Sequence, residues 1–389
     1  MIDTLFHGGP ILQGERMADG LALAVANGRI AWIGPVADAP AAARRVDLAG
    51  RMLLPGFIDV QVNGGGGVLF NDSQDPATLR TIVAAHARFG TTGLLPTLIS
   101  DRIEVFDAGI QAVEAAIAAG VPGVLGIHLE GPYLSEARRG IHPAEQLARP
   151  GPEAASRLTA LRGGKTLITL APEVTGTDFV RELGAAGALV SLGHTEADAK
   201  QIQAALTAGA RGFTHLFNAM PALLNRSPGP VGAALNDRNA WCGLIVDGFH
   251  VDPLVLRIAL ACRPLDRFLL VTDAMALVGD ADGTFAFNGE TITVEQGCPR
   301  SPDGVLAGSA LDMASAVRNA IDQLGLSLPQ AVAMASSAPA AFLGLEDQLG
   351  RLAPGLRANL VVVRAGLAVD QTWIDGNPAF LGDESELVL

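Results

Sequence analysis

Ionisable side chains stand at the ends of several apolar runs in this sequence, where an unpaired charge is costly. The runs are "GVLGIHLEG", "GALVSLGHT", "RGFTHLF" and "RFLLVTDA", and they carry Glu130, His194, His215 and Asp273. Two imidazoles and one carboxylate that leave a fourth position open suit a catalytic divalent metal, zinc first. A further carboxylate, Asp273, would then be free to act as the base of a metal-assisted hydrolysis.

Each of these residues also has an ordinary structural interpretation. Glu130 could be a buried acid paired with His128 or with a backbone amide. His194 and His215 could be core histidines bonded to the main chain, and Asp273 could cap a following helix. The spacing alone is only moderately specific, but the shared position at the ends of apolar runs favours a site.

Eight apolar runs, mostly separated by Ala-rich helical stretches, carry these residues between the two ends of the chain. Apolar strands that alternate with helices predict a parallel sheet. Eight such units predict an α/β fold with a (β/α)8 TIM-like barrel, which we place over residues 53–349. The carboxyl ends of all barrel strands meet at one mouth, so the four residues above should converge there.

The two ends of the chain have a different pattern, with short strand-like runs and hairpin signals at Asn27-Gly28 and Asp375-Gly376. We predict that residues 1–52 and 350–389 together form a small β-sandwich domain.

Composition excludes several classes of protein. Of the 389 residues, 49% are hydrophobic and 17% charged, which allows a large core. A net charge of −13 argues against a nucleic-acid-binding surface. The three cysteines, Cys242, Cys262 and Cys298, are far apart and predict free thiols in a reducing compartment. Because no leader pattern and no apolar run of about 18 residues is present, we expect no membrane span and a cytoplasmic location.

Taken in order, the segments "HLEGP", "GHT", "THLFNAMP", "DGFHVD" and "VTDA" resemble the N-acetylglucosamine-6-phosphate deacetylase family of the amidohydrolase superfamily. The resemblance runs from "LLPGFIDVQVNG" to "GRLAPGLRANLVVV". It implies metal-dependent hydrolysis of the acetamide of N-acetyl-D-glucosamine 6-phosphate to D-glucosamine 6-phosphate and acetate, in amino-sugar catabolism or cell-wall recycling. The alternatives are an N-acetylgalactosamine-6-phosphate deacetylase and, in a different class, a catalytically inactive sugar-phosphate-binding regulator.

The resemblance also implies roles for single residues at the reacting amide. Glu130, His194 and His215 would hold one divalent metal ion per subunit, most simply Zn²⁺, with Fe²⁺, Co²⁺ and Cd²⁺ as alternatives. Asp273 would be the general base and then the acid that protonates the leaving amine. His142, in "GIHP", would donate a hydrogen bond to the acetyl carbonyl.

Further roles concern the sugar phosphate. His250, Asn218 and the backbone of Ala219 would contact the phosphate, and Leu306 would belong to a loop near the sugar. Arg226, in "NRSPGP", would reach the phosphate in the site of a neighbouring subunit, which implies a homodimer.

The sequence departs from the wider superfamily at the end of the first barrel strand. Many members have two metal-binding histidines there, whereas this chain has Gln61 and Asn63. Neutral amides are poor zinc ligands, so we predict a single metal. Gln61 is expected to bind substrate or to hydrogen-bond near the activated water or Glu130. His7 and His86 are expected at the surface or in the small domain.

Overall fold

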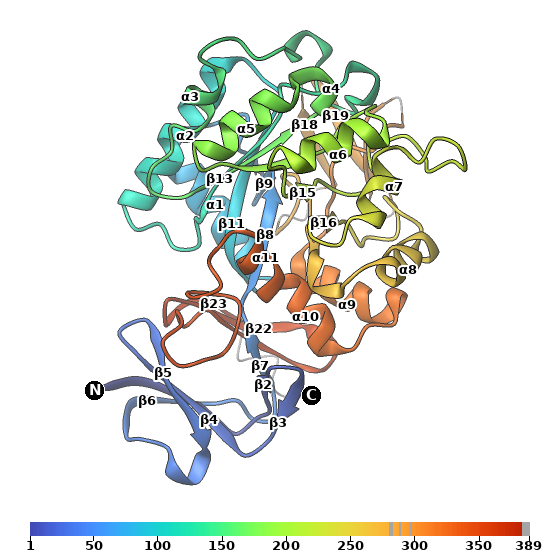
Figure 1. Cartoon of the computed structure of the whole chain (residues 1–389). Coiled ribbons are helices and arrows are strands. Elements are labelled where there is room, and N and C mark those ends of the chain that lie inside the picture. Colours follow the sequence, from blue (N-terminus) through green and yellow to red (C-terminus); the bar gives the residue numbers. More distant parts are fainter. Residues whose placement is uncertain (280–282, 288, 296–297, 303, 383–389) are drawn as a thin grey trace.

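The computed structural model describes residues 1–279, 283–287, 289–295, 298–302 and 304–382. Its largest sheet has eight strands in the order β17-β16-β15-β14-β13-β12-β11-β8, and every pair is parallel (Figure 1). These strands are β8 (Phe57–Val62), β11 (Thr91–Ile99), β12 (Gly126–Glu130), β13 (Lys165–Leu170), β14 (Leu189–Leu192), β15 (Gly212–Phe213), β16 (Trp241–Leu244) and β17 (Phe268–Leu270). The predicted TIM-like barrel is therefore confirmed, and each of the eight apolar runs supplies one strand.

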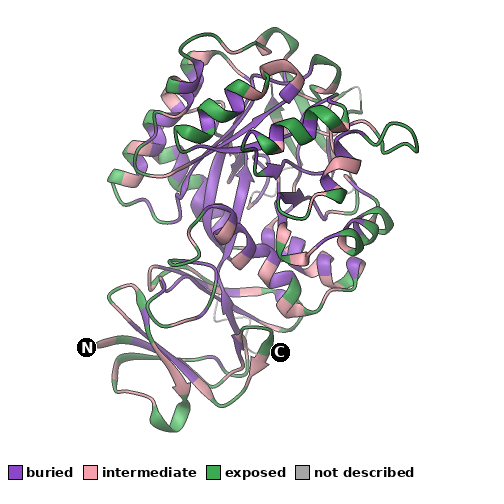
Figure 2. Ribbon diagram, in the orientation of Figure 1, coloured by how far each residue is buried: buried purple, intermediate pink, exposed green. Residues whose placement is uncertain are grey.

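Helices follow the strands and cover the outside of the barrel. They are α1 (Pro76–Ala87), α2 (Ile103–Ala118), α3 (Ala154–Leu158), α4 (Pro172–Thr175), α5 (Thr177–Ala185), α6 (Ala199–Thr207), α7 (Gly229–Asn236), α8 (Pro253–Cys262), α9 (Met313–Leu324), α10 (Leu328–Ala335) and α11 (Ser337–Phe342). Every residue of β8, β11 and β12 is buried, since one face of each strand lines the barrel interior and the other packs under helices (Figure 2). This explains why these strands are continuously apolar in sequence.

Local sequence sets where the helices begin. Asp75 accepts hydrogen bonds from the backbone of Ala77 and Thr78, and Pro76 occupies the first helical position of α1. Asp198 caps α6 and completes a capping box with Gln201. Each cap fixes the point where the chain turns from a barrel loop into a covering helix.

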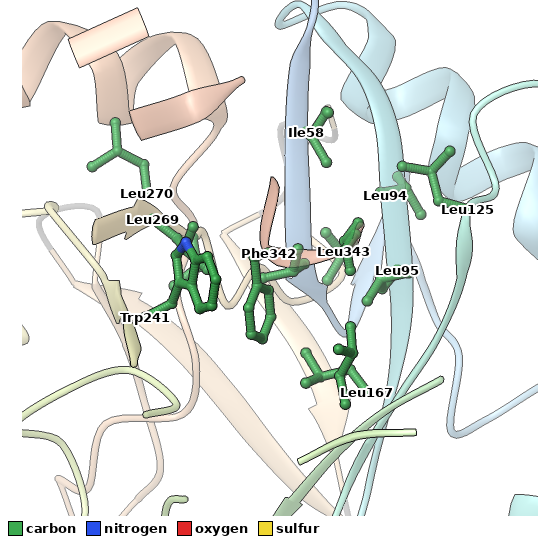
Figure 3. Close-up of a cluster of buried hydrophobic side chains, with 14 of the residues drawn as sticks. Ile58, Leu94, Leu95, Leu125, Leu167, Trp241, Leu269, Leu270, Phe342 and Leu343 are labelled. Atoms are coloured by element: carbon green, nitrogen blue, oxygen red, sulfur yellow. The ribbon is translucent and has the colours of Figure 1, made fainter. Parts of the chain in front are cut away.

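The end of the barrel opposite the strand carboxyl ends is closed by α11. Phe342 is 2% exposed, and its ring centroid lies 5.6 Å from that of Trp241. In Figure 3 it lies between Trp241 and Leu343, with Leu167 from the facing strand nearby. The barrel interior is therefore filled by side chains at this end and opens only at the other.

The barrel closes between β8 and the segment after β17. Asp273 N donates to Gln61 O (3.0 Å), and Asn63 N donates to Ala274 O (2.9 Å). Asp59 adds a side-chain link, because its Oδ2 accepts from Thr272 Oγ1 at 2.5 Å. We call these contacts between residues 59–63 and 272–274 the seam of the barrel. The seam brings the end of β8 directly beside Asp273.

The two ends of the chain build two sheets that share a core. One sheet has the order β5-β4-β1-β6 and the other β23-β22-β21-β7-β2-β3. Their strands are β1 (Ile2–His7), β2 (Ile11–Gln13), β3 (Arg16–Ala18), β4 (Leu21–Ala26), β5 (Arg29–Pro35), β6 (Ala42–Asp47), β7 (Met52–Pro55), β21 (Leu360–Val363), β22 (Val369–Ile374) and β23 (Asn377–Leu381). Phe6, Leu23 and Trp373 lie in the core between the sheets, so the predicted β-sandwich from both chain ends is confirmed.

The predicted hairpins are present in this small domain. Asn27-Gly28 joins β4 to β5 and Asp375-Gly376 joins β22 to β23, with positive φ at all four residues. The boundaries 1–52, 53–349 and 350–389 stay a prediction: β7 straddles the first of them, and residues 383–389 lie outside the described residues.

Two smaller sheets complete the fold. β9 (Gly64–Gly65) pairs with β10 (Val68–Leu69), and β18 (Thr284–Phe287), β19 (Glu290–Glu295) and β20 (Cys298–Arg300) form an antiparallel sheet. Short 3-10 turns occur at Val36–Asp38, Glu136–Arg138, Ala144–Gln146, Leu265–Arg267 and Ala365–Leu367. None of the helices in the described part of the chain is long and apolar enough to cross a membrane.

Candidate active site

Glu130, His194 and His215 meet at the carboxyl-end mouth of the barrel, as the sequence predicts. Glu130 Oε1 lies 3.0 Å from His215 Nε2 and 3.4 Å from His194 Nε2, and the two Nε2 atoms are 3.0 Å apart. All three residues are buried. The atoms point to one centre, which is the arrangement of a two-histidine, one-carboxylate metal site.

The ring orientations fit a bound cation. His194 Nδ1 donates to the carbonyl oxygen of Arg138 at 2.7 Å, which leaves the Nε2 lone pair directed at Glu130 and His215. Two imidazole lone pairs 3.0 Å apart repel unless a proton or a cation lies between them. The donor set suits zinc or a similar divalent ion, and among the described residues it is the only such group of three.

The backbone around this centre is strained. His194 (φ 49°), His215 (φ 30°) and Asp273 (φ 53°) all have positive φ, as does Ala219 (φ 52°). Residues other than glycine rarely adopt this conformation and persist in it only where the surrounding structure holds them. The loops after β14, β15 and β17 therefore contain strained backbone conformations that direct these side chains into the barrel mouth.

Asp273 lies beside the metal centre and is held by two amides. Asn63 Nδ2 donates to Asp273 Oδ1 at 2.7 Å, and Gln61 Nε2 donates to the same oxygen at 3.2 Å. Gln61 Nε2 also contacts both oxygens of Glu130 at 3.1 Å. The side-chain amide of Gln61 thus hydrogen-bonds to both carboxylates. The hydrogen bond from Gln61 to Glu130 was one of the two alternatives predicted for this residue.

The pKa values of Asp273 and Glu130 are shifted in opposite directions by their surroundings. Burial raises the pKa of Asp273, and the nearby charge of Glu130 raises it further, to about 6. Burial also opposes ionisation of Glu130, but the adjacent His194 and His215 hold its pKa well below the usual range. Glu130 therefore stays ionised, as the predicted metal ligand must, while Asp273 can exchange a proton near neutral pH.

The mouth contains a cavity of about 380 Å³ that these residues line together. Its lining includes five further residues that the sequence assigns to substrate: His142, Asn218, Ala219, His250 and Leu306. His250 is oriented by Asp247, whose Oδ2 lies 2.6 Å from His250 Nδ1. The cavity thus unites the predicted metal ligands and base with these five predicted substrate contacts, whereas Gln61, also predicted to bind substrate, does not line it. The individual roles stay predictions.

Arg226 does not line this cavity. It is exposed on the turn between Leu224 and Ser227, which form an isolated antiparallel bridge. This yellow-green hairpin projects from the barrel at the right of Figure 1 and is exposed in Figure 2. Arg226 therefore has no part in the site of its own chain.

Sequence reasoning did not assign roles to several residues around the site. Asn63 holds Asp273, and its position two residues after Gln61 on the same strand face was a usable signal. Arg138 lines the cavity and supplies the carbonyl that orients His194. His128 contacts Thr97 and Thr169 through its two ring nitrogens.

The expectation that His86 lies at the surface or in the small domain is wrong. His86 is fully buried on α1 in the barrel, with Nε2 2.9 Å from the carbonyl oxygen of Gly64. A histidine on the inner face of a helix can be buried when a backbone carbonyl oxygen accepts a hydrogen bond from its ring. Burial also lowers the pKa of His86, so the imidazole stays neutral.

Comparison with known proteins agrees with this geometry. A model of the amidohydrolase family matches residues 52–379. The chain belongs to the amidohydrolase family. Members of this family similar to the chain include an N-acetylgalactosamine-6-phosphate deacetylase from Shewanella sp. (strain ANA-3), 45% identical over 86% of this chain and 84% of that protein. An N-acetylglucosamine-6-phosphate deacetylase from Vibrio furnissii is 36% identical over 84% of this chain and 83% of that protein.

The fold agrees with solved amidohydrolase structures as well. The crystal structure of N-acetylglucosamine-6-phosphate deacetylase from Pasteurella multocida superimposes with a TM-score of 0.93 and 34% sequence identity, covering 96% of this chain and 98% of that one. The family resemblance predicted from the sequence motifs is confirmed.

Asp59 generates a prediction about pH and stability. It is fully buried, and burial raises its pKa from 3.8 to about 7 despite hydrogen bonds from Thr272 and the backbone of Gln61. Between pH 3.8 and 7 the folded chain holds a proton that the unfolded chain has lost. The free energy of unfolding should therefore fall as pH rises through this range, by at most about 1.4 kcal/mol per pH unit.

Asp59→Asn removes this titration. Relative to the wild type, the metal-free variant should gain stability steadily between about pH 4 and 7, as measured by urea unfolding at several pH values. Asp322→Asn, a change at an exposed position on α9, is the matched control and should not reproduce this gain. If the free energy of unfolding changed with pH in the same way for Asp59→Asn and the wild type, the raised pKa of Asp59 would be contradicted.

Proposed function

We propose that this amidohydrolase removes the acetyl group from an N-acetylhexosamine 6-phosphate, with N-acetyl-D-glucosamine 6-phosphate as the main substrate and acetate and D-glucosamine 6-phosphate as products. One observation carries the proposal. The buried group of Glu130, His194 and His215 shares a cavity with Asp273, in a chain whose relatives are deacetylases of such sugars. We place the reaction in amino-sugar catabolism or cell-wall recycling.

The reaction at the amide follows from the positions of these groups. When bound by Glu130, His194 and His215, a divalent metal supplies a Lewis acid that activates water and polarises the acetyl carbonyl. Asp273 takes the proton from the attacking water and later delivers it to the leaving nitrogen. His142 donates to the carbonyl oxygen, where negative charge develops, a contribution typically worth roughly 2.7–4 kcal/mol of the barrier.

The phosphate would bind in the same cavity, at His250, Asn218 and the backbone of Ala219. His250, oriented by Asp247, would contact the phosphate, and Asn218 and the Ala219 backbone lie on the loop after His215. Because the chain carries a net charge of −13, an anionic substrate must be held by such local donors rather than attracted by the whole protein. A phosphate bound far from the amide orients the reacting group, so its loss should lower the rate as well as the affinity.

We also propose a homodimer in which Arg226 reaches the phosphate in the neighbouring subunit's site. Exposed apolar side chains support this arrangement. Six of the ten large apolar side chains exposed in the described residues lie in two stretches of the chain: Leu223 and Leu224 next to Arg226, and Phe249, Leu254, Val255 and Ile258 in or just before α8. Exposed apolar side chains of this kind are typical of protein contact surfaces.

Zinc is the metal we propose, with Fe²⁺, Co²⁺ and Cd²⁺ also compatible with two imidazoles and a carboxylate. We propose one metal per subunit, which is supported by the amides of Gln61 and Asn63, since both hydrogen-bond to carboxylates. A cytoplasmic location suits the free cysteines Cys242 and Cys262.

A second candidate substrate is N-acetyl-D-galactosamine 6-phosphate. It is favoured by the 45% identity to the Shewanella enzyme named for that sugar. The two sugars differ only in the orientation of the hydroxyl group on C4, whereas the acetamide is on C2, so both fit the same chemistry at the amide.

The function is tested by acetate release from the zinc-loaded protein. N-acetylglucosamine 6-phosphate, its galactosamine epimer and unphosphorylated N-acetylglucosamine should be compared under identical conditions. We expect turnover of the phosphorylated sugars, fastest with the first, and much slower turnover of the unphosphorylated sugar. Metal bound without turnover of any of them would reject the enzyme and favour an inactive sugar-phosphate-binding regulator.

Arg226→Ala tests the contribution across the dimer. Loss of a charge-assisted hydrogen bond should raise KM for the phosphorylated sugar roughly 10- to 100-fold and leave activity on unphosphorylated N-acetylglucosamine nearly unchanged. Arg80→Ala, a change at an exposed position on α1, is the matched control and should alter neither value.

Mixing subunits makes this test sharper. In a dimer of one Arg226→Ala and one Asp273→Ala subunit, one of the two sites has both an intact base and a neighbouring arginine. Mixed dimers should therefore recover low KM and about half of the wild-type activity. Equal effects of Arg226→Ala on phosphorylated and unphosphorylated sugars would contradict the phosphate role.

A further inference from the structure

The proposed role of His142 depends on which of its ring nitrogens carries the proton. A neutral imidazole has one nitrogen that donates and one that accepts, so only one tautomer can donate to a substrate carbonyl. The ring of His142 lines the cavity and lies 4.5 Å from that of His194, measured between centroids. The residue that selects the tautomer is therefore part of the catalytic arrangement.

Ser100 makes this selection by two contacts to the same nitrogen. Its backbone N–H donates to His142 Nδ1 at 3.1 Å, and its Oγ lies 2.8 Å from Nδ1. A backbone N–H can only donate, so Nδ1 must accept, and the proton of neutral His142 is on Nε2. Among the described residues Nε2 has no hydrogen-bond partner, so its proton is available to a ligand in the cavity.

The surrounding chain fixes Ser100 in this position. Ser100 follows β11 directly and is 2% exposed. Asn71 anchors the preceding residue, since its Oδ1 accepts from Ile99 N at 3.0 Å and its Nδ2 donates to Ile99 O at 3.3 Å. Gly131 leaves the space that Ser100 needs, because a Cβ there would lie 2.2 Å from Ser100 Oγ. The residue after the ligand Glu130 is thus a glycine that accommodates this serine.

The loop that carries His142 is held from the other side. His142 N donates to Arg139 O at 3.0 Å, and Arg139 Nη1 donates to His142 O at 2.9 Å. These bonds fix the backbone of His142 but do not touch its ring. The ring orientation is therefore left to Ser100.

We propose that Ser100 is a positioning residue that holds His142 as the tautomer protonated on Nε2, ready to donate to the acetyl carbonyl oxygen. The inference rests on the proposed deacetylase function. It adds a residue directly after β11, a strand that contributes none of the proposed metal ligands, and it explains why a buried serine follows that strand.

Nitrogen-15 NMR of the zinc-loaded full chain with labelled histidine tests the tautomer without any substrate. At neutral pH, His142 should show an unprotonated Nδ1 and a protonated Nε2, and its signals are assigned by their absence from His142→Gln. A proton on Nδ1 would overturn the proposal. Because this measurement does not depend on turnover, it stands even if the proposed substrates prove wrong.

Kinetics test the positioning role. Ser100→Ala keeps the backbone donor but loses Oγ, so kcat should fall about 2- to 10-fold with KM and zinc content unchanged, and Ser100→Thr should restore it. In the His142→Gln background, Ser100→Ala should have no further effect on kcat. A raised KM with unchanged kcat, or effects of the two substitutions that simply multiply, would show a merely structural serine and overturn the proposal.

Discussion

Two buried carboxylates that share one amide donor constrain this structure more than any other interaction. Gln61 Nε2 contacts both Glu130 and Asp273, so two acids lie within reach of one neutral group. Two like charges cannot both ionise in a buried site at no cost. His194 and His215 stabilise the charge of Glu130, and the metal they would hold with it completes the compensation. Asp273 is left with a raised pKa, which is the property that a proton-transferring base needs.

Closure of the barrel and assembly of the site depend on the same residues. The regular parallel ladder ends at β8 and β17, and individual hydrogen bonds complete the ring. Asp59 binds Thr272, and Gln61 O accepts from Asp273 N. Ser309 adds bonds from its Oγ to Thr272 O and from its N to Asp273 O. Asp273, the proposed base, is therefore fixed by these bonds, and a change that loosens them should move Asp273 before it disturbs Glu130, His194 and His215.

The sequence predicted the barrel and the convergence of polar residues because both follow from local patterns. An apolar run that ends in Glu130 or His194 signals a strand end at the barrel mouth, whichever helices surround it. The partners of those side chains were harder to predict, since they depend on the register between strands. Ser100 and His142 are 42 residues apart in sequence, and no local feature of either points to the other. His86 was misplaced for the same reason, because the carbonyl that makes its burial acceptable lies 22 residues away.

The most direct test of this account is zinc content and acetate release measured together on Asp273→Asn. The amide keeps the shape of the side chain but cannot accept and return a proton. We predict zinc content equal to that of the wild type and a kcat for N-acetylglucosamine 6-phosphate at least about 100-fold lower. Near wild-type turnover with zinc bound would remove Asp273 as the base, and loss of zinc together with activity would place it among the ligands instead.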